Sequence, residues 1–157
     1  MDTCTMKMQE EDMFDWNAPA VHRAVVEQIN EAVIVVDREG IVRVWNAGAE
    51  AVFGHAAAEM LGGGLEAIVP ERLWQAHDSG FRRAVESGQA KHAGRVMTTR
   101  AVHKSGARRY VDISFSMLRD ADGAVFGVAA VGRDCTEREE AKRAAQATAG
   151  PTPAAAS

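Results

Sequence analysis

Residues 32–54 read AVIVVDREGIVRVWNAGAEAVFG, and this stretch decides the fold. Two short apolar runs, 32–37 and 41–45, flank the turn residues from Asp37 to Gly40. This is the pattern of two antiparallel strands joined by a tight turn. Asn46 then suits a helix N-cap and Gly54 suits the residue that closes the helix. The stretch therefore predicts a strand hairpin that leads directly into a short helix.

The residues before this hairpin predict one more helix. Between residues 18 and 30 the apolar positions recur at helical spacing, and they are Val21, Val25, Val26 and Ile29. Such an amphipathic helix has to bury its apolar stripe against the domain or against a second copy of the chain. Residues 1–17 are acidic and rich in methionine, without the pattern of a signal peptide, and they are expected to be a disordered or loosely packed tail.

The residues after the hairpin predict a mainly antiparallel sheet. A short helix is expected over 57–61 and is broken by Gly62–Gly64; a longer helix follows over 70–87. Strands are expected at 93–102, 108–118 and 125–132, and a last helix runs to about residue 148 before a disordered tail at 149–157. Two strands, several helices and three more strands make an α+β domain with its helices over one face of the sheet.

Composition limits the classes of function. The chain has 157 residues, of which 46% are hydrophobic and 25% charged, so it fits one domain with tails. Its net charge of −4 gives no case for nucleic acid, and no apolar run is long enough to span a bilayer, so we expect a cytoplasmic protein without a membrane partner. Cys4 and Cys135 are the only cysteines, and they form neither a disulfide framework nor a Cys-x-x-Cys motif.

His77 is the most informative single residue. On the helix over 70–87 it shares one face with Leu73 and Phe81, so its imidazole is predicted to lie on the apolar side. A titratable ring in such a place either has its nitrogens satisfied by protein groups or binds a metal. The residues alone leave both interpretations open.

Several dispersed motifs, in the right order, resemble a PAS domain over roughly residues 25–143. They are the 36–40 turn, the segments 45–50 and 53–54, the Lys104–Gly106 hairpin turn, and Gly132-Arg133-Asp134-Cys135-Thr136-Glu137. The resemblance implies a PAS fold, with a five-stranded antiparallel sheet, over 31–134. It also implies that the last strand of the sheet continues into a signalling helix at 135–148.

A closer likeness concerns residues 72–79, RLWQAHDS, which are similar to the heme-binding PAS domains of rhizobial oxygen-sensor kinases and the enteric direct oxygen sensor. This resemblance implies a b-type heme with His77 as its proximal ligand. Ile113 and Phe115 match the bulky apolar positions that cover the distal side, and Arg83 matches the arginine that binds the heme propionates. Gly80 is a departure, because the resembled proteins have tyrosine there.

The strand expected at 93–102 carries a second departure. Arg95, Met97 and Thr99 share parity there and are expected to face the pocket. The enteric sensor has methionine and arginine at the positions of Arg95 and Met97, so this chain has them in exchanged order. We expect Met97 to be the sixth iron ligand and Arg95 a propionate or gas partner. The alternative is that Met97 fills the core and Arg95 pairs with an acid at the rim.

These observations favour a heme-based sensor of a diatomic gas (O2, CO or NO) or of redox state. Two alternatives remain: a heme-free PAS module for dimerisation or protein interaction, and a flavin or small-metabolite sensor. Photochemistry of the LOV type is not expected, because no cysteine lies between Cys4 and Cys135. No catalytic constellation is present, so we expect no enzyme. The output is expected to pass through a homodimer, a signalling protein in trans or a missing effector domain.

Overall fold

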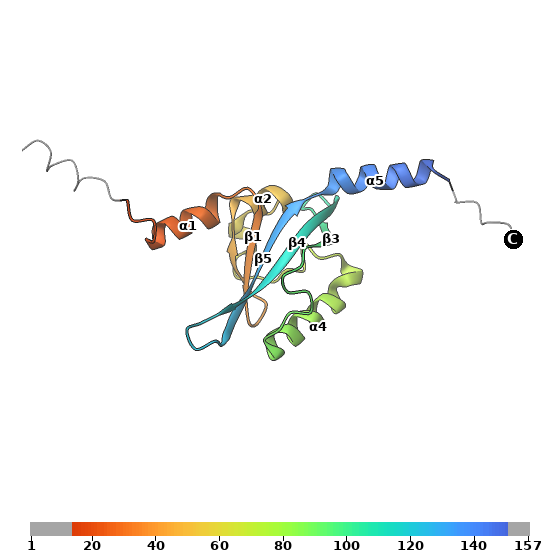
Figure 1. Ribbon diagram of the computed structural model, residues 1–157. Helices are drawn as coiled ribbons and strands as arrows, with labels where there is room; N and C mark the ends of the chain where they lie inside the picture. The colour runs from red at the N-terminus through yellow and green to blue at the C-terminus, as the bar shows by residue number, and fades with distance from the viewer. Residues whose placement is uncertain (1–13, 151–157) are drawn as a thin grey trace, which may run out of the picture.

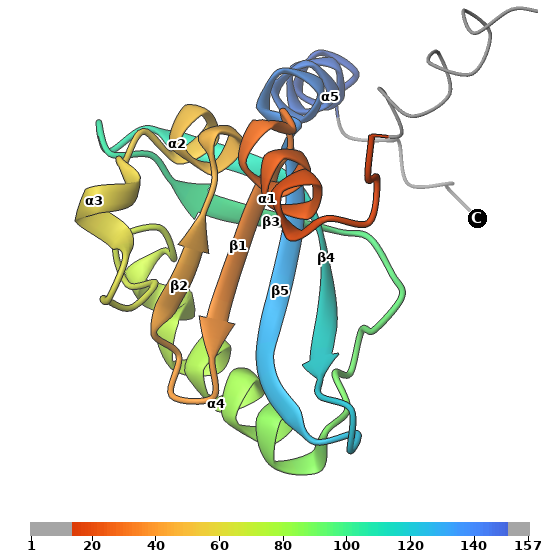
Figure 2. The same ribbon diagram turned by 90° about the vertical axis from the view of Figure 1, so that its left-hand side faces the viewer.

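The computed structural model describes residues 14–150 (Figure 1). The described chain forms one five-stranded antiparallel sheet with strand order β2-β1-β5-β4-β3 (Figure 2). The elements in chain order are α1 (Pro19–Gln28), β1 (Ala32–Asp37), β2 (Val42–Trp45), α2 (Ala47–Phe53), α3 (Ala57–Met60), α4 (Glu71–Ser87), β3 (Met97–Val102), β4 (Arg108–Arg119), β5 (Val125–Asp134) and α5 (Thr136–Thr148). The predicted α+β class and the five-stranded sheet are confirmed.

The hairpin predicted at 32–45 is present as β1 and β2. Asp37 fixes its turn, since one carboxylate oxygen accepts hydrogen bonds from the backbone N–H groups of Glu39 and Ile41, each at 3.0 Å. Gly40 has a φ of +82°, a left-handed conformation that glycine adopts without a steric cost. The turn residues therefore do what the sequence pattern predicts.

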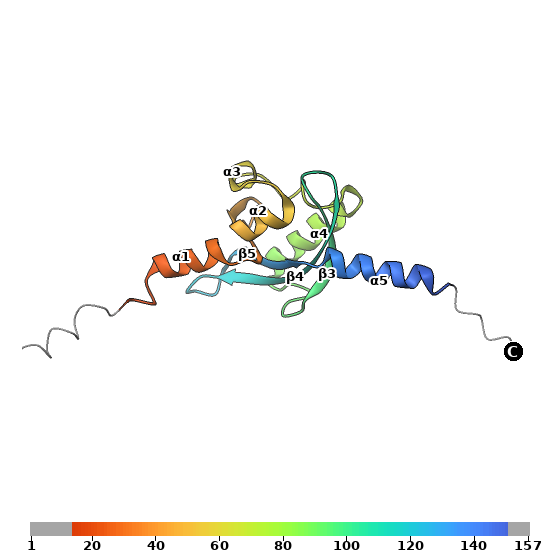
Figure 3. The ribbon, with the colours of Figure 1, turned by 90° about the horizontal axis from the view of Figure 1, so that it is seen from above.

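Helices α2, α3 and α4 all lie on one face of the sheet (Figure 3). The core fills the space between that face and the helices, with Val42, Phe53 and Val111 as its most completely buried large side chains. Helices α1 and α5 instead project from the sheet in opposite directions (Figures 1 and 3). None of the helices in the described range is long and apolar enough to cross a membrane.

Asn46 joins three elements from inside the core, where only 3% of its surface is exposed. Its side-chain oxygen accepts from the N–H of Ala49, which caps α2 as predicted, and from the N–H of Val33 in β1. Its amide nitrogen donates to the backbone oxygens of Val26 and Glu31, at 2.9 and 3.0 Å. One side chain thus fixes the end of α1 against β1 and α2.

The rest of α1 is held less tightly. None of its residues is buried. Val25 is 57% exposed, and Ile29, just beyond the helix, is 39% exposed. The predicted apolar stripe exists, but the domain covers only part of it, since Val21 and Val26 are half-buried whereas Val25 and Ile29 are exposed. Burial by a second copy, the other option for this stripe, stays a prediction.

Other boundaries differ from the sequence-based prediction. The third strand begins at Met97 rather than at residue 93, because Gly94 turns with a φ of +75° and the N–H of Arg95 bonds back to the oxygen of His92 at 3.1 Å. The last strand continues to Asp134 rather than ending at residue 132. The tails predicted at 1–17 and 149–157 lie largely outside the described residues.

Candidate functional site

Helix α4 carries the predicted histidine and lies over the helix-covered face of the sheet. Its C-terminal half is anchored: Val85 is buried, Phe81 lies beside the turn at Gly40, and Arg119 donates a hydrogen bond to the oxygen of Gly88. The half that carries His77 has no buried residue. The helix is therefore fixed at one end and less closely packed around the histidine.

His77 is half-buried, and its ring stacks on that of Trp74, with centroids 5.6 Å apart and planes 23° apart. Its Nδ1 atom is buried and has no hydrogen-bond partner among the described residues. Burial lowers the pKa of His77, against the opposing influence of the nearby carboxylates of Asp78 and Glu66. The imidazole is thus held neutral, the form in which histidine binds a metal, and it keeps an unsatisfied ring nitrogen.

The apolar face of β4 becomes less buried along the strand. Val111 is 1% exposed, whereas Ile113, Phe115 and Met117 on the same face are only half-buried at the edge of the core. Close packing normally leaves few gaps between such side chains and the helix that covers them. The row of half-buried apolar residues on the helix-covered face is therefore a place where the chain packs less closely than around Val111.

Two further residues border this place. Met97 lies directly opposite Ile113 in the antiparallel register of β3 and β4, so both side chains share the helix-covered face. On α4, a Cβ added at Gly80 would meet no atom within 4 Å, so the helix surface is open one turn beyond His77. The departure to glycine leaves room there.

Among the six site residues predicted from sequence, four fall on elements that face one another. His77 lies on α4, while Met97, Ile113 and Phe115 lie on the sheet face that it covers. Arg83 is on α4 but exposed. Arg95 is exposed in the turn before β3, so the parity argument that placed it beside Met97 was wrong.

Sequence reasoning missed a polar network directly behind this site. Asp112, on the other face of β4, accepts from the hydroxyl of Thr98 in β3 at 2.6 Å. It also accepts two hydrogen bonds from the guanidinium of Arg138 in α5, at 2.6 and 2.9 Å. These bonds hold the pKa of Asp112 far below its usual range. Thr98 follows Met97 in β3, and Asp112 precedes Ile113 in β4. The network therefore connects the strands of the site to α5.

The junction to α5 is fixed by a second set of bonds. Asp134 accepts from the N–H of Thr136 at 2.8 Å, and the Thr136 hydroxyl accepts from the N–H of Tyr110 at 2.9 Å. Between them, Cys135 is buried. Helix α5 is therefore attached to β4 at its first turn.

Two relatives cover most of this chain but only a small part of their own length. An uncharacterized protein of Azorhizobium caulinodans is 29% identical over 126 residues, which is 80% of this chain and 17% of that protein. The oxygen sensor protein DosP of Escherichia coli is 24% identical over 114 residues, which is 73% of this chain and 14% of that protein.

Solved structures agree with the fold. A PAS domain from Colwellia psychrerythraea superposes with a TM-score of 0.65 at 20% identity, covering 74% of this chain and 96% of that one. An RNA-binding light-oxygen-voltage receptor gives a TM-score of 0.70 at 22% identity, covering 88% of this chain and 39% of that one. At these identities the likeness concerns the fold alone.

The family is settled by a direct match. The family described as "PAS fold" matches residues 26–140, which include all five strands and every residue of the candidate site. This chain belongs to the PAS family, whose members are sensory and signal-transducing modules.

Proposed function

We propose that this PAS domain binds a b-type heme between α4 and the sheet, with His77 as a ligand to its iron. The observation that carries the proposal is the buried, unpartnered Nδ1 of a neutral His77 beside a half-buried apolar face. A buried polar atom without a partner costs free energy, so a group that satisfies the imidazole is expected. The likeness to the oxygen sensor DosP supports heme as that group.

The chain's own residues suit distinct tasks around such a group. Ile113 and Phe115 would exclude water from the group, and Met97, opposite Ile113, carries a thioether that could be a second protein ligand to its iron. The exposed cations Arg83 and Arg95 would neutralise the propionate carboxylates at the rim. When bound, the heme supplies an iron that takes up O2, CO or NO or changes its redox state.

The same strands offer a route for the signal. A shift of Met97 and Ile113 on the inner face would move the next residues, Thr98 and Asp112, on the outer face. Asp112 holds Arg138 of α5, so the orientation of that helix would follow. The ligand must bind two arrangements of this network with different affinity, because otherwise it shifts neither. We propose that α5 then passes the signal to a further domain of the same chain or to a separate signalling protein.

The visible absorption spectrum tests the proposal. Protein mixed with hemin should show a Soret band that shifts on binding, and His77→Ala should lose it. The matched control is His22→Ala, which removes an exposed histidine from α1 and should leave the spectrum unchanged. No binding by the unaltered chain would end the proposal, and a spectrum that survives His77→Ala would remove His77 as ligand.

Met97 is tested separately. If its sulfur is a second protein ligand to the iron, the iron of the reduced, gas-free protein should be six-coordinate, and Met97→Leu should make it five-coordinate at similar side-chain volume. A spectrum unaffected by Met97→Leu would assign this residue to core packing.

A second candidate function is a heme-free dimerisation module. It is favoured by the apolar surface that α2, α3 and α4 leave uncovered, namely Val25 and Ile29 at α1 and Val131 on β5, each more than a third exposed. In that case the chain should form a dimer without any cofactor, and Val25→Glu should dissociate it. A cofactor-free monomer in sedimentation would exclude this function. If the chain is instead a flavin or small-metabolite sensor, hemin should not bind specifically, and a flavin or metabolite should bind to the protein and stabilise it.

A further inference from the structure

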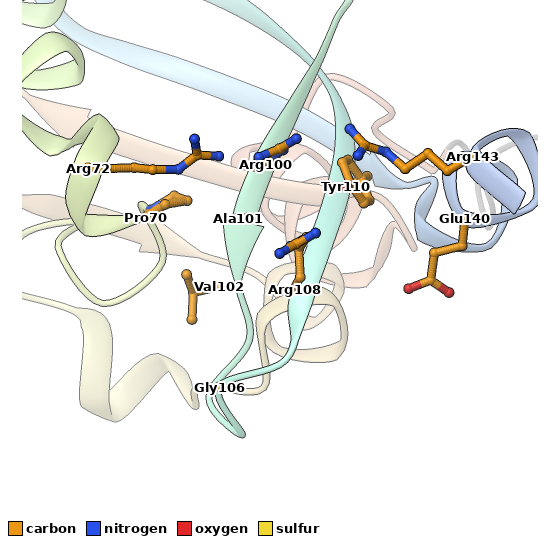
Figure 4. A pocket seen from close by; sticks show the side chains of 10 residues that line it. All are labelled: Pro70, Arg72, Arg100, Ala101, Val102, Gly106, Arg108, Tyr110, Glu140 and Arg143. Atoms are coloured by element: carbon orange, nitrogen blue, oxygen red, sulfur yellow. The ribbon is translucent and has the colours of Figure 1, made fainter. Parts of the chain in front are cut away.

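A pocket of about 590 Å³ lies on the side of β3 and β4 that faces α5, apart from the His77 site (Figure 4). None of the six residues assigned to the heme lines it. Its walls come from four segments: the start of α4, strand β3, strand β4 with its turn, and α5. Four arginines line it, and they are Arg72, Arg100, Arg108 and Arg143.

The pocket concentrates positive charge in a chain whose formal net charge is −4. Glu140 is the only acidic residue in its lining, against four guanidinium groups. None of the four forms an ion pair within the described residues, whereas Arg43, Arg133 and Arg138 each pair with a carboxylate. Like charges held together without a counter-ion repel one another, so a bound anion would stabilise this arrangement.

Tyr110 provides an independent sign of a missing ligand. Its side chain lines the pocket and is only 4% exposed, and its hydroxyl is buried without a hydrogen-bond partner among the described residues. Two of the guanidiniums lie over its ring, Arg100 at 5.8 Å and Arg143 at 5.1 Å from the centroid. An anion that drew these two arginines off the ring and reached the hydroxyl would give that hydroxyl an acceptor.

We propose that this pocket binds a small molecule that carries two or more phosphate groups. A pyrophosphate group carries about three negative charges at neutral pH, which balances four arginines and one glutamate. Planar guanidiniums bind phosphate oxygens through paired hydrogen bonds. The volume is in the range of about 300–1,000 Å³ that small-molecule sites occupy.

Binding here would act on the same helix as the network at Asp112. Arg143 and Glu140 belong to α5, whereas Arg100 and Arg108 belong to β3 and β4. A polyphosphate held by both groups would attach α5 to the sheet beyond the contact at Arg138. The ligand would therefore bias the position of α5, and this inference does not depend on heme at His77.

Calorimetry with the full chain tests the inference, with inorganic pyrophosphate and ATP as probes and adenosine as the uncharged comparison. We expect both phosphate probes to bind and adenosine not to bind. Arg100→Gln and Arg143→Gln should each weaken binding about tenfold, and higher salt should weaken it further. Tyr110→Phe keeps the ring and removes the hydroxyl, and it should weaken binding less than either arginine variant.

The control is Arg43→Gln, which removes an exposed arginine from β2, the strand at the other edge of the sheet. It should bind pyrophosphate like the unaltered chain, and circular dichroism should show that all variants are folded. Absence of binding, or equal loss in the control, would overturn the proposal. So would arginine variants that change only the oligomeric state, because the cluster would then belong to an interface. The His77→Ala variant should bind the probes normally, which separates this outcome from that of the heme experiments.

Discussion

Replacing Asn46 with alanine should destabilise the domain severely. In its buried position this side chain accepts hydrogen bonds from Val33 and Ala49 at 2.8 and 2.9 Å and donates to Val26 and Glu31 at 2.9 and 3.0 Å. At a net value of about 1 kcal/mol for each bond, the loss amounts to about 4 kcal/mol. The free energy of unfolding of a small domain is about 5–15 kcal/mol, so this loss would remove roughly a quarter to four fifths of it.

The Asn46→Asp variant separates the two halves of this network. It keeps the acceptor for Val33 and Ala49 but turns a carboxylate oxygen toward the backbone oxygens of Val26 and Glu31. Burial and those oxygens should raise the pKa of the new carboxyl group. A raised acid pKa destabilises the folded state above the unfolded pKa, so the deficit should shrink as the pH falls from 7 toward 4.

Urea unfolding followed by circular dichroism measures both variants. The reasoning is refuted if Asn46→Ala costs less than about 1 kcal/mol, since the bonds would then be replaced by water or by rearranged backbone. It also fails if the penalty of Asn46→Asp is the same at pH 7 and pH 5. If Asn46→Ala unfolds only α1 and leaves the sheet folded, Asn46 serves only to hold that helix. Removal of the residues before Glu31 should then change the stability as Asn46→Ala does.

Further predictions concern two glycines and one carboxylate. Gly48→Ala should destabilise by about 3 kcal/mol in urea unfolding, because its Cβ would lie 2.1 Å from the backbone oxygen of Glu31. Gly80→Ala, in open space on a helix, should instead stabilise by about 1 kcal/mol, and a loss would contradict the open surface. Asp112→Asn should reduce stability at pH 7. Since the folded pKa of Asp112 is lowered, wild-type stability should fall as the pH drops below about 4, and this fall should be shallower in the variant. Hydrogen exchange should then be faster in α5, which loses its contact through Arg138.

The parts of the fold that depend on neighbouring residues could be predicted from the sequence. The β1–β2 hairpin follows from alternation and from the turn at Asp37 and Gly40, and the α2 cap follows from Asn46. The error at Arg95 is also local: alternation was extended backwards through Gly94, whose left-handed φ ends the strand register. Gly94, three residues before the observed start at Met97, was the signal that should have ended the predicted strand.

The long-range contacts could not be predicted in the same way. The bonds of Asn46 to Val26 and of Asp112 to Arg138 join residues 20 and 26 positions apart. Each partner alone is an ordinary cap or a surface ion. The arginine pocket has the same origin, because its four guanidiniums come from separate segments that only the sheet brings together. The contact between Trp74 and His77 could have been predicted, because side chains three positions apart on a helix are neighbours.

Strands β3 and β4 give the two proposed sites a common mechanical element. Their inner face carries Met97 and Ile113, and their outer face carries Asp112 and Tyr110, both in contact with α5. If heme at His77 and a polyphosphate at Tyr110 each favour one arrangement of this strand pair, each must change the other's affinity by the same factor. Pyrophosphate titrations with and without heme, and hemin titrations with and without pyrophosphate, should therefore give equal ratios. A ratio of one in both would mean that the two ligands do not favour a shared arrangement of the strand pair, and that the signal reaches α5 by another route.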